Sequence, residues 1–184
     1  GMFTIDLTDL GCDFYTASSH KWLFSPKGVG VFYAKKESQN LLKPLMVARG
    51  HTDTSIRRLE NYNTRNLAEV LGLGASIDFH NMIGPERIHE RTFELKRYFR
   101  SKIGNDPRFE LKSPVSDKLS AAIQVVEIKG MNVNEVKDQL EHKYGIDCRP
   151  MGSHNLNALR LSFAIYMTKA DIDYLVDALI QIAG

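Results

Sequence analysis

The sequence is poor in cysteine and has no long hydrophobic run. Its two cysteines, Cys12 and Cys148, cannot form a disulfide framework or, on their own, a four-ligand zinc site, so each is expected to be a small buried thiol in a reducing compartment. No window approaches the ~20 consecutive apolar residues that a membrane-spanning helix needs. The N-terminal residues lack the charged and apolar regions of a signal peptide. We therefore expect a cytoplasmic protein with no membrane partner.

Net charge is also nearly absent. The 24 Lys and Arg residues are almost balanced by 22 Asp and Glu, which leaves +2. This balance argues against an extended basic surface for nucleic acid, although a local patch remains compatible with it. With 184 residues, 43% of them hydrophobic and 25% charged, the composition is ordinary for a globular protein of one domain or two small lobes.

The first hundred residues predict a short sheet followed by two helices. β-prone runs at residues 13–17 and 29–34 are separated by a polar cluster and a Ser-Pro-Lys-Gly turn, and Gly30 allows close backbone approach. Residues 48–63 are polar and predict a loop. Apolar residues at helical spacing start at Leu67, and Gly84-Pro85 separates this helix from a second one ending near residue 103. Gly72 and Gly74 suggest close contacts of the first helix.

The remaining residues predict a small α+β lobe. Strands are expected at 109–111, 121–128 and 158–163, and helices at 133–144 and 169–182. Asn132 or Asn134 would open the first of these helices and Gly145 would close it. We place a domain boundary near residue 105. The lobe before it has too few strands for a closed sheet, so a truncated domain is expected, with Gly1-Met2 as a cloning scar.

The sharpest local feature is the polar cluster Ser18-Ser19-His20-Lys21 between the first two strands. A lysine there could serve as a carbonyl-reactive amine if burial or nearby positive charge lowered its pKa. The hydroxyls and the imidazole could meanwhile hold an anion such as phosphate. The alternative is a surface lysine that follows a polar turn.

Two segments resemble class V aminotransferases, a family of fold-type I pyridoxal-phosphate enzymes. Residues 13–33 are similar to the family's lysine segment, and residues 159–168 with 171–173 are similar to its C-terminal motif. The resemblance implies an α/β fold. Residues 1–105 would be the end of a PLP-transferase-like large domain, and 106–184 a small α+β C-terminal domain.

The resemblance also assigns roles to individual residues. Lys21 would bind the cofactor, pyridoxal 5'-phosphate, covalently, while Ser18 and His20 would contact its phosphate. Thr64 falls where the family often has a threonine that reaches a phosphate across a dimer interface, although Asn63 replaces the usual glycine before it. Arg160 would hold the α-carboxylate of an amino-acid substrate, because its planar fork matches two oxygens.

Each of these residues also has a simpler interpretation. His20 could cap the end of the strand, Thr64 could be the N-cap of the helix that follows, and Arg160 could be an ion-pair partner on the lobe surface. The family's aspartate that pairs with the pyridine nitrogen lies upstream of the lysine segment, and Asp6 and Asp9 lie too close to Lys21 to match it. Half of the cofactor site is therefore expected to be missing.

The sulfur chemistry of the family requires a cysteine that this sequence lacks at the matching place. Desulfurases carry a nucleophilic cysteine on the loop before the carboxylate-binding arginine, and residues 150–157 contain none. Cys148 precedes that loop and would need an exposed, electropositive setting to react. The loop favours an epimerase-like or aminotransferase-like enzyme, with His154 either in the substrate pocket or solvated.

Three functions follow from these observations. The first is a homodimeric pyridoxal-phosphate enzyme that acts on a small amino acid, with this chain as its C-terminal part. The second is an inactive folded module that self-associates or pairs with a missing N-terminal half. The third is nucleic-acid binding through Arg57-Arg58 and residues 87–102, but acidic residues interrupt the latter stretch and favour a solvated helix face.

Overall fold

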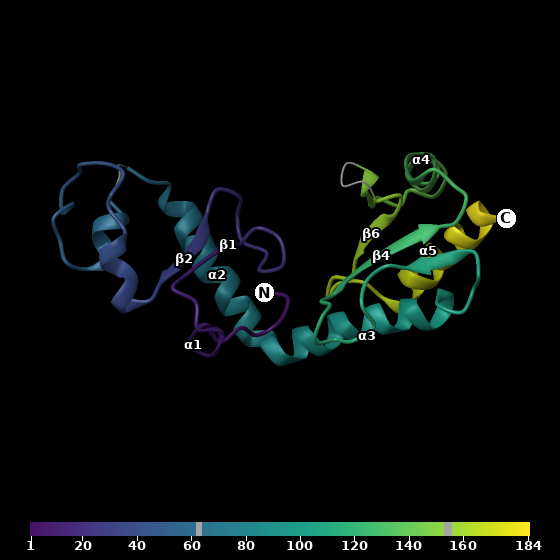
Figure 1. Ribbon diagram of the computed structural model, residues 1–184, viewed down its shortest axis with the longest axis horizontal. Helices are drawn as coiled ribbons and strands as arrows, with labels where there is room; N and C mark the ends of the chain where they lie inside the picture. Colours follow the sequence, from purple (N-terminus) through teal and green to yellow (C-terminus); the bar gives the residue numbers. More distant parts are fainter. Residues whose placement is uncertain (62–63, 153–155) are drawn as a thin grey trace. The chain divides into compact units, whose positions relative to one another are not determined.

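The computed structural model describes residues 1–61, 64–152 and 156–184, which form two compact units. The first unit contains Gly1 and Phe3–Pro85, and the second contains Met2 and Glu86–Gly184. Helices and strands occur in both units, so the α/β class predicted from the sequence is confirmed (Figure 1). The predicted domain limits, 1–105 and 106–184, stay predictions; by packing, the chain divides between Pro85 and Glu86.

The first unit is built on a two-stranded antiparallel ribbon. Strands β1 (Phe14–Ser18) and β2 (Gly30–Ala34) pair from Phe14 opposite Ala34 to Ser18 opposite Gly30. The helices of this unit are α1 (Leu7–Leu10), the 3-10 helices η1 (Lys36–Leu41) and η2 (Ile56–Leu59), and α2 (Leu67–Ile83). The sequence predicted the two strands and α2, but not the three short helices, which are too short to show a periodicity.

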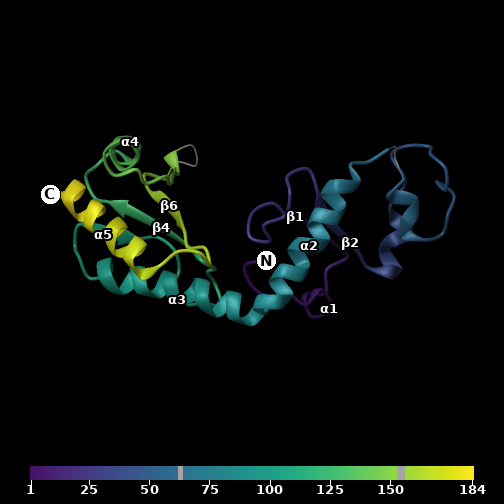
Figure 2. The same ribbon diagram turned by 180° about the vertical axis from the view of Figure 1, so that it is seen from behind.

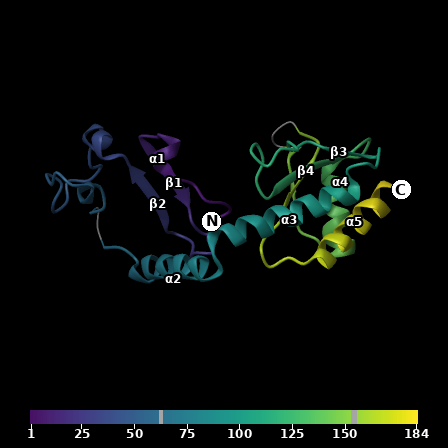
Figure 3. The same cartoon turned by 90° about the horizontal axis from the view of Figure 1, so that it is seen from below.

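Helix α2 lies alongside the segment that joins β1 to β2 (Figures 2 and 3). A Cβ on Gly72 would come within 2.5 Å of the Pro26 ring, so this glycine permits a close contact, as predicted. The same prediction for Gly74 is wrong, since nothing lies within 4 Å of a Cβ built there. Gly30 also fits its prediction, because a Cβ would lie 2.9 Å from the carbonyl oxygen of Ala17.

These two helix glycines form a matched pair for a stability test. We expect Gly74→Ala to raise the free energy of unfolding of the first unit by up to ~1 kcal/mol, because alanine favours the helix and meets no neighbour. Gly72→Ala is expected to lower it by roughly 1–3 kcal/mol, because the new methyl group overpacks against Pro26. Urea unfolding followed by the fluorescence of Trp22, the single tryptophan, measures both changes. Equal stabilisation by both alanines would contradict the observed packing.

Within its described residues, the second unit consists of a four-stranded antiparallel sheet and three α-helices. The strands are β3 (Phe109–Leu111), β4 (Ile123–Ile128), β5 (Arg149–Pro150) and β6 (Leu159–Ser162), in the order β3-β4-β6-β5. The helices are α3 (Pro85–Ile103), α4 (Val133–Tyr144) and α5 (Lys169–Ala183). None of the helices in the described ranges has the length and apolar composition needed to cross a membrane.

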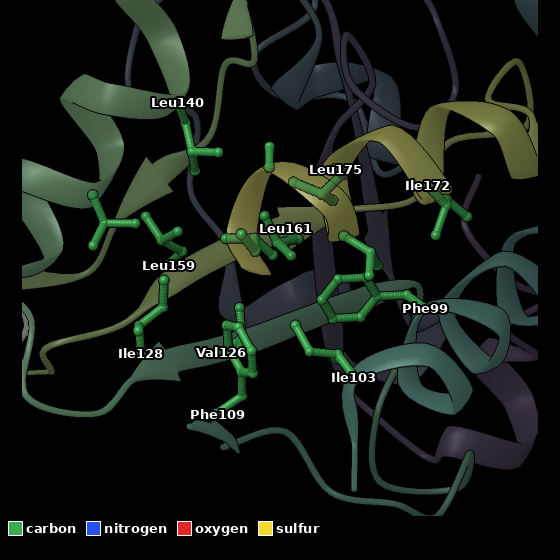
Figure 4. Packing of buried hydrophobic residues seen from close by; sticks show 14 of the residues in the cluster. Phe99, Ile103, Phe109, Val126, Ile128, Leu140, Leu159, Leu161, Ile172 and Leu175 are labelled. Carbon is green, nitrogen blue, oxygen red and sulfur yellow. The ribbon is translucent and has the colours of Figure 1, made fainter. Parts of the chain in front are cut away.

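One hydrophobic core holds this unit together. Burial alternates along β4, where Val126 and Ile128 are buried, so one face of the sheet is covered. All three helices contribute to the cluster on that face, for example through Phe99 of α3, Leu140 of α4 and Leu175 of α5 (Figure 4). Helix α3 therefore packs as part of this unit.

The helix ends of the second unit follow the sequence signals. Pro85 occupies the first position of α3. The side chain of Asn132 accepts a hydrogen bond from the Asn134 N–H at 2.9 Å, which identifies Asn132 as the N-cap of α4. Gly145 ends this helix with φ 65°, a conformation that glycine adopts without strain. These caps explain why the predicted limits of both helices were accurate.

Candidate active site

Lys21 lies in a tight turn directly after β1. The Phe24 N–H donates to the Lys21 carbonyl and the Ser25 N–H donates to the Ser19 carbonyl, both at 3.2 Å, so the turn is fixed by its own backbone. The side chains of Ser18, His20 and Lys21 are exposed. An amine, an imidazole and a hydroxyl are therefore exposed to solvent within four consecutive residues.

Ser19 differs from its neighbours in the cluster. Its side chain is buried, and its hydroxyl has no hydrogen-bond partner among the described residues. The alternation of exposed Ser18, buried Ser19 and exposed His20 continues the two-residue period of β1. It agrees with the predicted assignment of Ser18 and His20 as anion contacts and Ser19 as a spacer, which stays a prediction.

Thr64 is exposed and lies just before α2. Asn66, and not Thr64, caps this helix, because the Asn66 side chain accepts from the Ala68 N–H at 3.1 Å. The alternative interpretation of Thr64 as the N-cap is therefore wrong, and its predicted contact with a phosphate stays open. Asn63, which precedes it, and His154 lie outside the described residues.

The carboxylate of Asp6 is already used within the fold. It accepts hydrogen bonds from the backbone N–H groups of Asp9 at 3.2 Å and Thr8 at 2.8 Å and so caps α1. These two bonds lower the pKa of Asp6 below its ordinary value. Asp6 therefore has a structural role, which agrees with the expectation that it does not serve as a cofactor aspartate.

Arg160 lies in β6, where it registers opposite Val125 of β4 and Arg149 of β5. It lines a hollow of about 790 Å³ in the second unit. The Nε of Arg160 is buried and has no partner among the described residues, which is costly for a charged group unless a ligand pairs with it. A carboxylate is the ligand that the planar guanidinium fork fits best. The alternative, an ion-pair partner on the lobe surface, finds no support in the ion pairs of the described residues.

Cys148 lines the same hollow but is a poor nucleophile there. Burial, and to a smaller extent the neighbouring Asp147, raise the pKa of Cys148 to about 11. The reactive form is the thiolate, and it is scarce at neutral pH when the pKa is this high. Both cysteines are free thiols and only partly buried, so the prediction of two buried thiols holds only in part.

Two tyrosines that line the hollow were not predicted from the sequence. Tyr166 and Tyr174, both exposed, line it together with Met167 and Leu175. Tyr166 lies inside the C-terminal motif, so its place in that segment was the available signal. Tyr174 lies in α5, and nothing in the sequence alone indicates that it shares a hollow with Arg160.

Several of the basic residues considered for nucleic acid have partners within the fold. Arg58 donates to the backbone carbonyls of Ser55 at 3.0 Å, Leu42 at 3.1 Å and Gln39 and so ties η2 to η1. Along α3, Arg91 pairs with Glu94 at 2.9 Å and Lys102 pairs with Asp173 at 2.9 Å. These contacts give the cations a role within the fold.

Comparison with known proteins gives matches that extend over nearly the whole chain. The aminotransferase class-V family matches residues 1–175. Isopenicillin N epimerase from Streptomyces clavuligerus is 30% identical over 201 residues, covering 100% of this chain and 50% of the epimerase. The chain spans about half the length of the curated relatives it matches.

Two solved structures illustrate the similarity of the fold. The cysteine desulfurase CsdA from Escherichia coli has a TM-score of 0.84 at 25% identity, covering 98% of this chain and 48% of CsdA. A lysine-to-alanine mutant of C-DES, solved with glycine covalently linked to its PLP cofactor, has a TM-score of 0.81 at 17% identity, covering 97% of this chain and 48% of that one. The α/β architecture is thus that of part of these enzymes.

Proposed function

The chain belongs to the class V aminotransferase family, and from this premise we propose that it is the lysine-bearing and carboxylate-binding part of a pyridoxal-phosphate enzyme that acts on an amino acid. The observation that carries the proposal is the fixed turn on which Ser18, His20 and Lys21 stand exposed. The resemblance stated from two motifs is confirmed by the family match.

The residues of the turn fit pyridoxal 5'-phosphate by their chemistry. Lys21 would carry the cofactor on its amine, and Ser18, His20 and Thr64 would contact its phosphate, since hydroxyl and imidazole groups are suitable donors to phosphate oxygens. The buried, unpaired Nε of Arg160 fits a substrate carboxylate in the same way. When bound, the cofactor withdraws electrons from the substrate and makes its α-carbon proton acidic.

The chain's own residues would then bind the substrate and move one proton. The guanidinium of Arg160 would donate two hydrogen bonds to the α-carboxylate and fix the orientation of the amino acid. The Nζ of Lys21 would take the proton that leaves the α-carbon. Racemisation, transamination and β-elimination share this abstraction and differ in what happens afterwards.

Among the activities of the family, we propose an epimerase-like or transaminase-like one over desulfuration. Cys148 supports this choice because its raised pKa makes it a poor nucleophile. The epimerase relative at 30% identity is compatible with it. A homodimer, a cytoplasmic location and a role for His154 in the substrate pocket belong to the same proposal.

The alternative is a folded module without catalysis of its own. Its support is the apolar surface of the first unit, where Leu71 is 65% exposed, Phe32 51% and Leu45 97%. Where exposed apolar side chains gather into a patch, they mark a surface for self-association or for a partner chain. The proposed catalytic function and this alternative differ in whether the chain organises a cofactor at Lys21.

Titration with pyridoxal 5'-phosphate, borohydride reduction and peptide mapping decide between them. We expect saturable labelling of Lys21 and its loss in Lys21→Ala. Lys27→Ala is the matched control, because Lys27 is exposed in the same connection between β1 and β2 and should leave the labelling of Lys21 unchanged. Scattered labelling of many lysines, identical in Lys21→Ala, would reject the catalytic proposal for this chain and favour the module.

A further inference from the structure

The two buried side chains of α2 are both polar. Ser76 and His80 are buried, whereas apolar residues of the same helix such as Leu71 and Met82 are 65% and 79% exposed. Buried polar groups are retained in folds where they make specific hydrogen bonds. Their partners here lie in the turn that carries Lys21.

His80 uses both ring nitrogens. Nε2 lies 2.9 Å from the carbonyl oxygen of Trp22, the residue after Lys21, and Nδ1 lies 3.1 Å from the carbonyl oxygen of Ser76. Backbone carbonyls only accept and a neutral imidazole carries one N–H, so the tautomer with its proton on Nε2 donates to the Trp22 carbonyl. The Ser76 contact is local to α2, whereas the Trp22 contact spans 58 positions in the sequence and links the helix to the lysine turn.

The same turn contains a strained residue that α2 supports. Phe24 has φ 58°, a left-handed conformation that costs a non-glycine residue energy and persists only where surroundings enforce it. Ser76 Oγ lies 3.3 Å from the Phe24 carbonyl oxygen and 2.8 Å from that of Gly72, so its single O–H is shared between the turn and the helix. The rings of His80 and Phe79 lie 5.5 Å and 6.5 Å from the Phe24 ring.

We propose that His80 is a positioning residue for Lys21. Through its Nε2–H bond to Trp22 and its contact with the Phe24 ring, it holds the turn in the conformation that presents the lysine amine. The importance of that conformation for cofactor binding rests on the proposed function. The stabilisation of the turn by His80 is independent of the proposed function, because it depends only on contacts within the first unit.

The test compares three variants of this 184-residue chain. His80→Leu removes the ring N–H while it keeps an apolar side chain, and His80→Gln restores a donor at the reach of Nε2. His142→Leu is the matched control, because His142 Nδ1 makes the same helical contact to a carbonyl four residues back, at 2.8 Å from Asp138 O, but the His142 side chain is exposed on α4.

Two measurements are made on each variant. Amide hydrogen exchange of Phe24 and Ser25, whose N–H groups close the turn, is expected to accelerate roughly 10- to 100-fold in His80→Leu and to recover largely in His80→Gln. Borohydride-trapped pyridoxal phosphate on Lys21 is expected to fall about tenfold in His80→Leu, measured against the labelling of Lys27 in the same sample. His142→Leu should change neither quantity.

The two measurements separate the two proposals. Unchanged exchange of Phe24 and Ser25 in His80→Leu would overturn the positioning role. Accelerated exchange with undiminished labelling of Lys21 would overturn it as well, because the turn would then be irrelevant to the amine. If wild-type Lys21 takes no specific label, the proposed function fails, and the exchange result alone decides whether His80 holds the turn.

Discussion

Replacing Asp117 with alanine is expected to lower the free energy of unfolding of the second unit by about 2–3 kcal/mol, less than for a fully buried pair because the Asp117 side chain is 38% exposed and water can partly solvate the ammonium left behind. Asp117 is the counterion of Lys96, whose side chain is fully buried and whose Nζ lies 2.8 Å from the Asp117 carboxylate. After the substitution, the ammonium would retain the Ser120 hydroxyl at 2.8 Å and the Phe93 ring at 4.5 Å, neither of which carries a charge. A buried charge without its counterion is among the most destabilising defects in a protein.

Hydrogen exchange of core amides in α3, such as those of Leu95 and Phe99, measures this loss. Asp138→Ala is the control, because Asp138 is an exposed acid 3.6 Å from Lys137, and surface pairs of this kind contribute at most ~1 kcal/mol. A second variant, Lys96→Met, should cost much less than Asp117→Ala, since it removes the buried charge itself. A small effect of Asp117→Ala, equal to that of Asp138→Ala, would contradict the argument.

The Lys96–Asp117 pair also makes the free energy of unfolding of this unit depend on pH. Partial burial acts to raise the pKa of Asp117, but hydrogen bonds from Lys96 and Arg97 outweigh it, so the pKa lies below the ordinary value of 3.8. A carboxylate whose pKa is lowered by folding stabilises the native state above its unfolded pKa. This contribution should therefore be complete above about pH 4 to 5 and disappear as the pH falls through the folded pKa, and Asp117→Ala should lack it.

Replacing Arg160 with methionine is expected to weaken binding of an amino-acid carboxylate by about 10²- to 10⁴-fold while leaving stability almost unchanged. Two charge-assisted hydrogen bonds would be lost, each contributing about 1.5–3 kcal/mol. Stability should not suffer, because the Arg160 Nε has no partner within the described fold and its removal leaves no group unpaired. Weakened binding with unchanged stability is expected of a residue that contacts a ligand and does not stabilise the fold.

NMR titration with L-alanine, in the presence of pyridoxal phosphate, follows binding through the amides of β6. Arg160→Lys keeps the charge but loses the fork, so its affinity should fall between those of wild type and Arg160→Met. Arg87→Met removes an exposed arginine of α3 and should change neither affinity nor stability. A loss of more than about 2 kcal/mol of stability in Arg160→Met would identify Arg160 as structural and contradict the proposal.

Local signals in the sequence were sufficient to predict most of the fold. Pro85, Asn132 and Gly145 act on the few residues around them, so α3 and α4 were predicted with their correct ends. Periodicity likewise predicted that residues from Leu67 onward are helical. It could not show which side of α2 is covered, because that depends on the turn packed against it, and the covered side proved to be polar.

The residues of the candidate site likewise fall into those that local motifs predict and those that depend on distant contacts. Lys21 and Arg160 were found because each lies in a contiguous motif whose residue types carry the chemistry. His80 was missed because its function depends on a hydrogen bond to a residue 58 positions away. The unpaired Nε of Arg160 and the suppressed reactivity of Cys148 arise from burial, which one-dimensional patterns describe only on average.

The unequal burial in the two units has a consequence for calorimetry. Among the described residues, all buried hydrophobic side chains except Ala34 belong to the second unit. Heat-capacity change and unfolding enthalpy scale with the apolar surface that unfolding exposes, so the two units should contribute unequally to a thermogram. The first unit would melt at lower temperature with a shallow, broad endotherm, and the second would give the main peak. A single melting temperature would then describe neither unit, and a ligand at Lys21 would shift only the earlier transition.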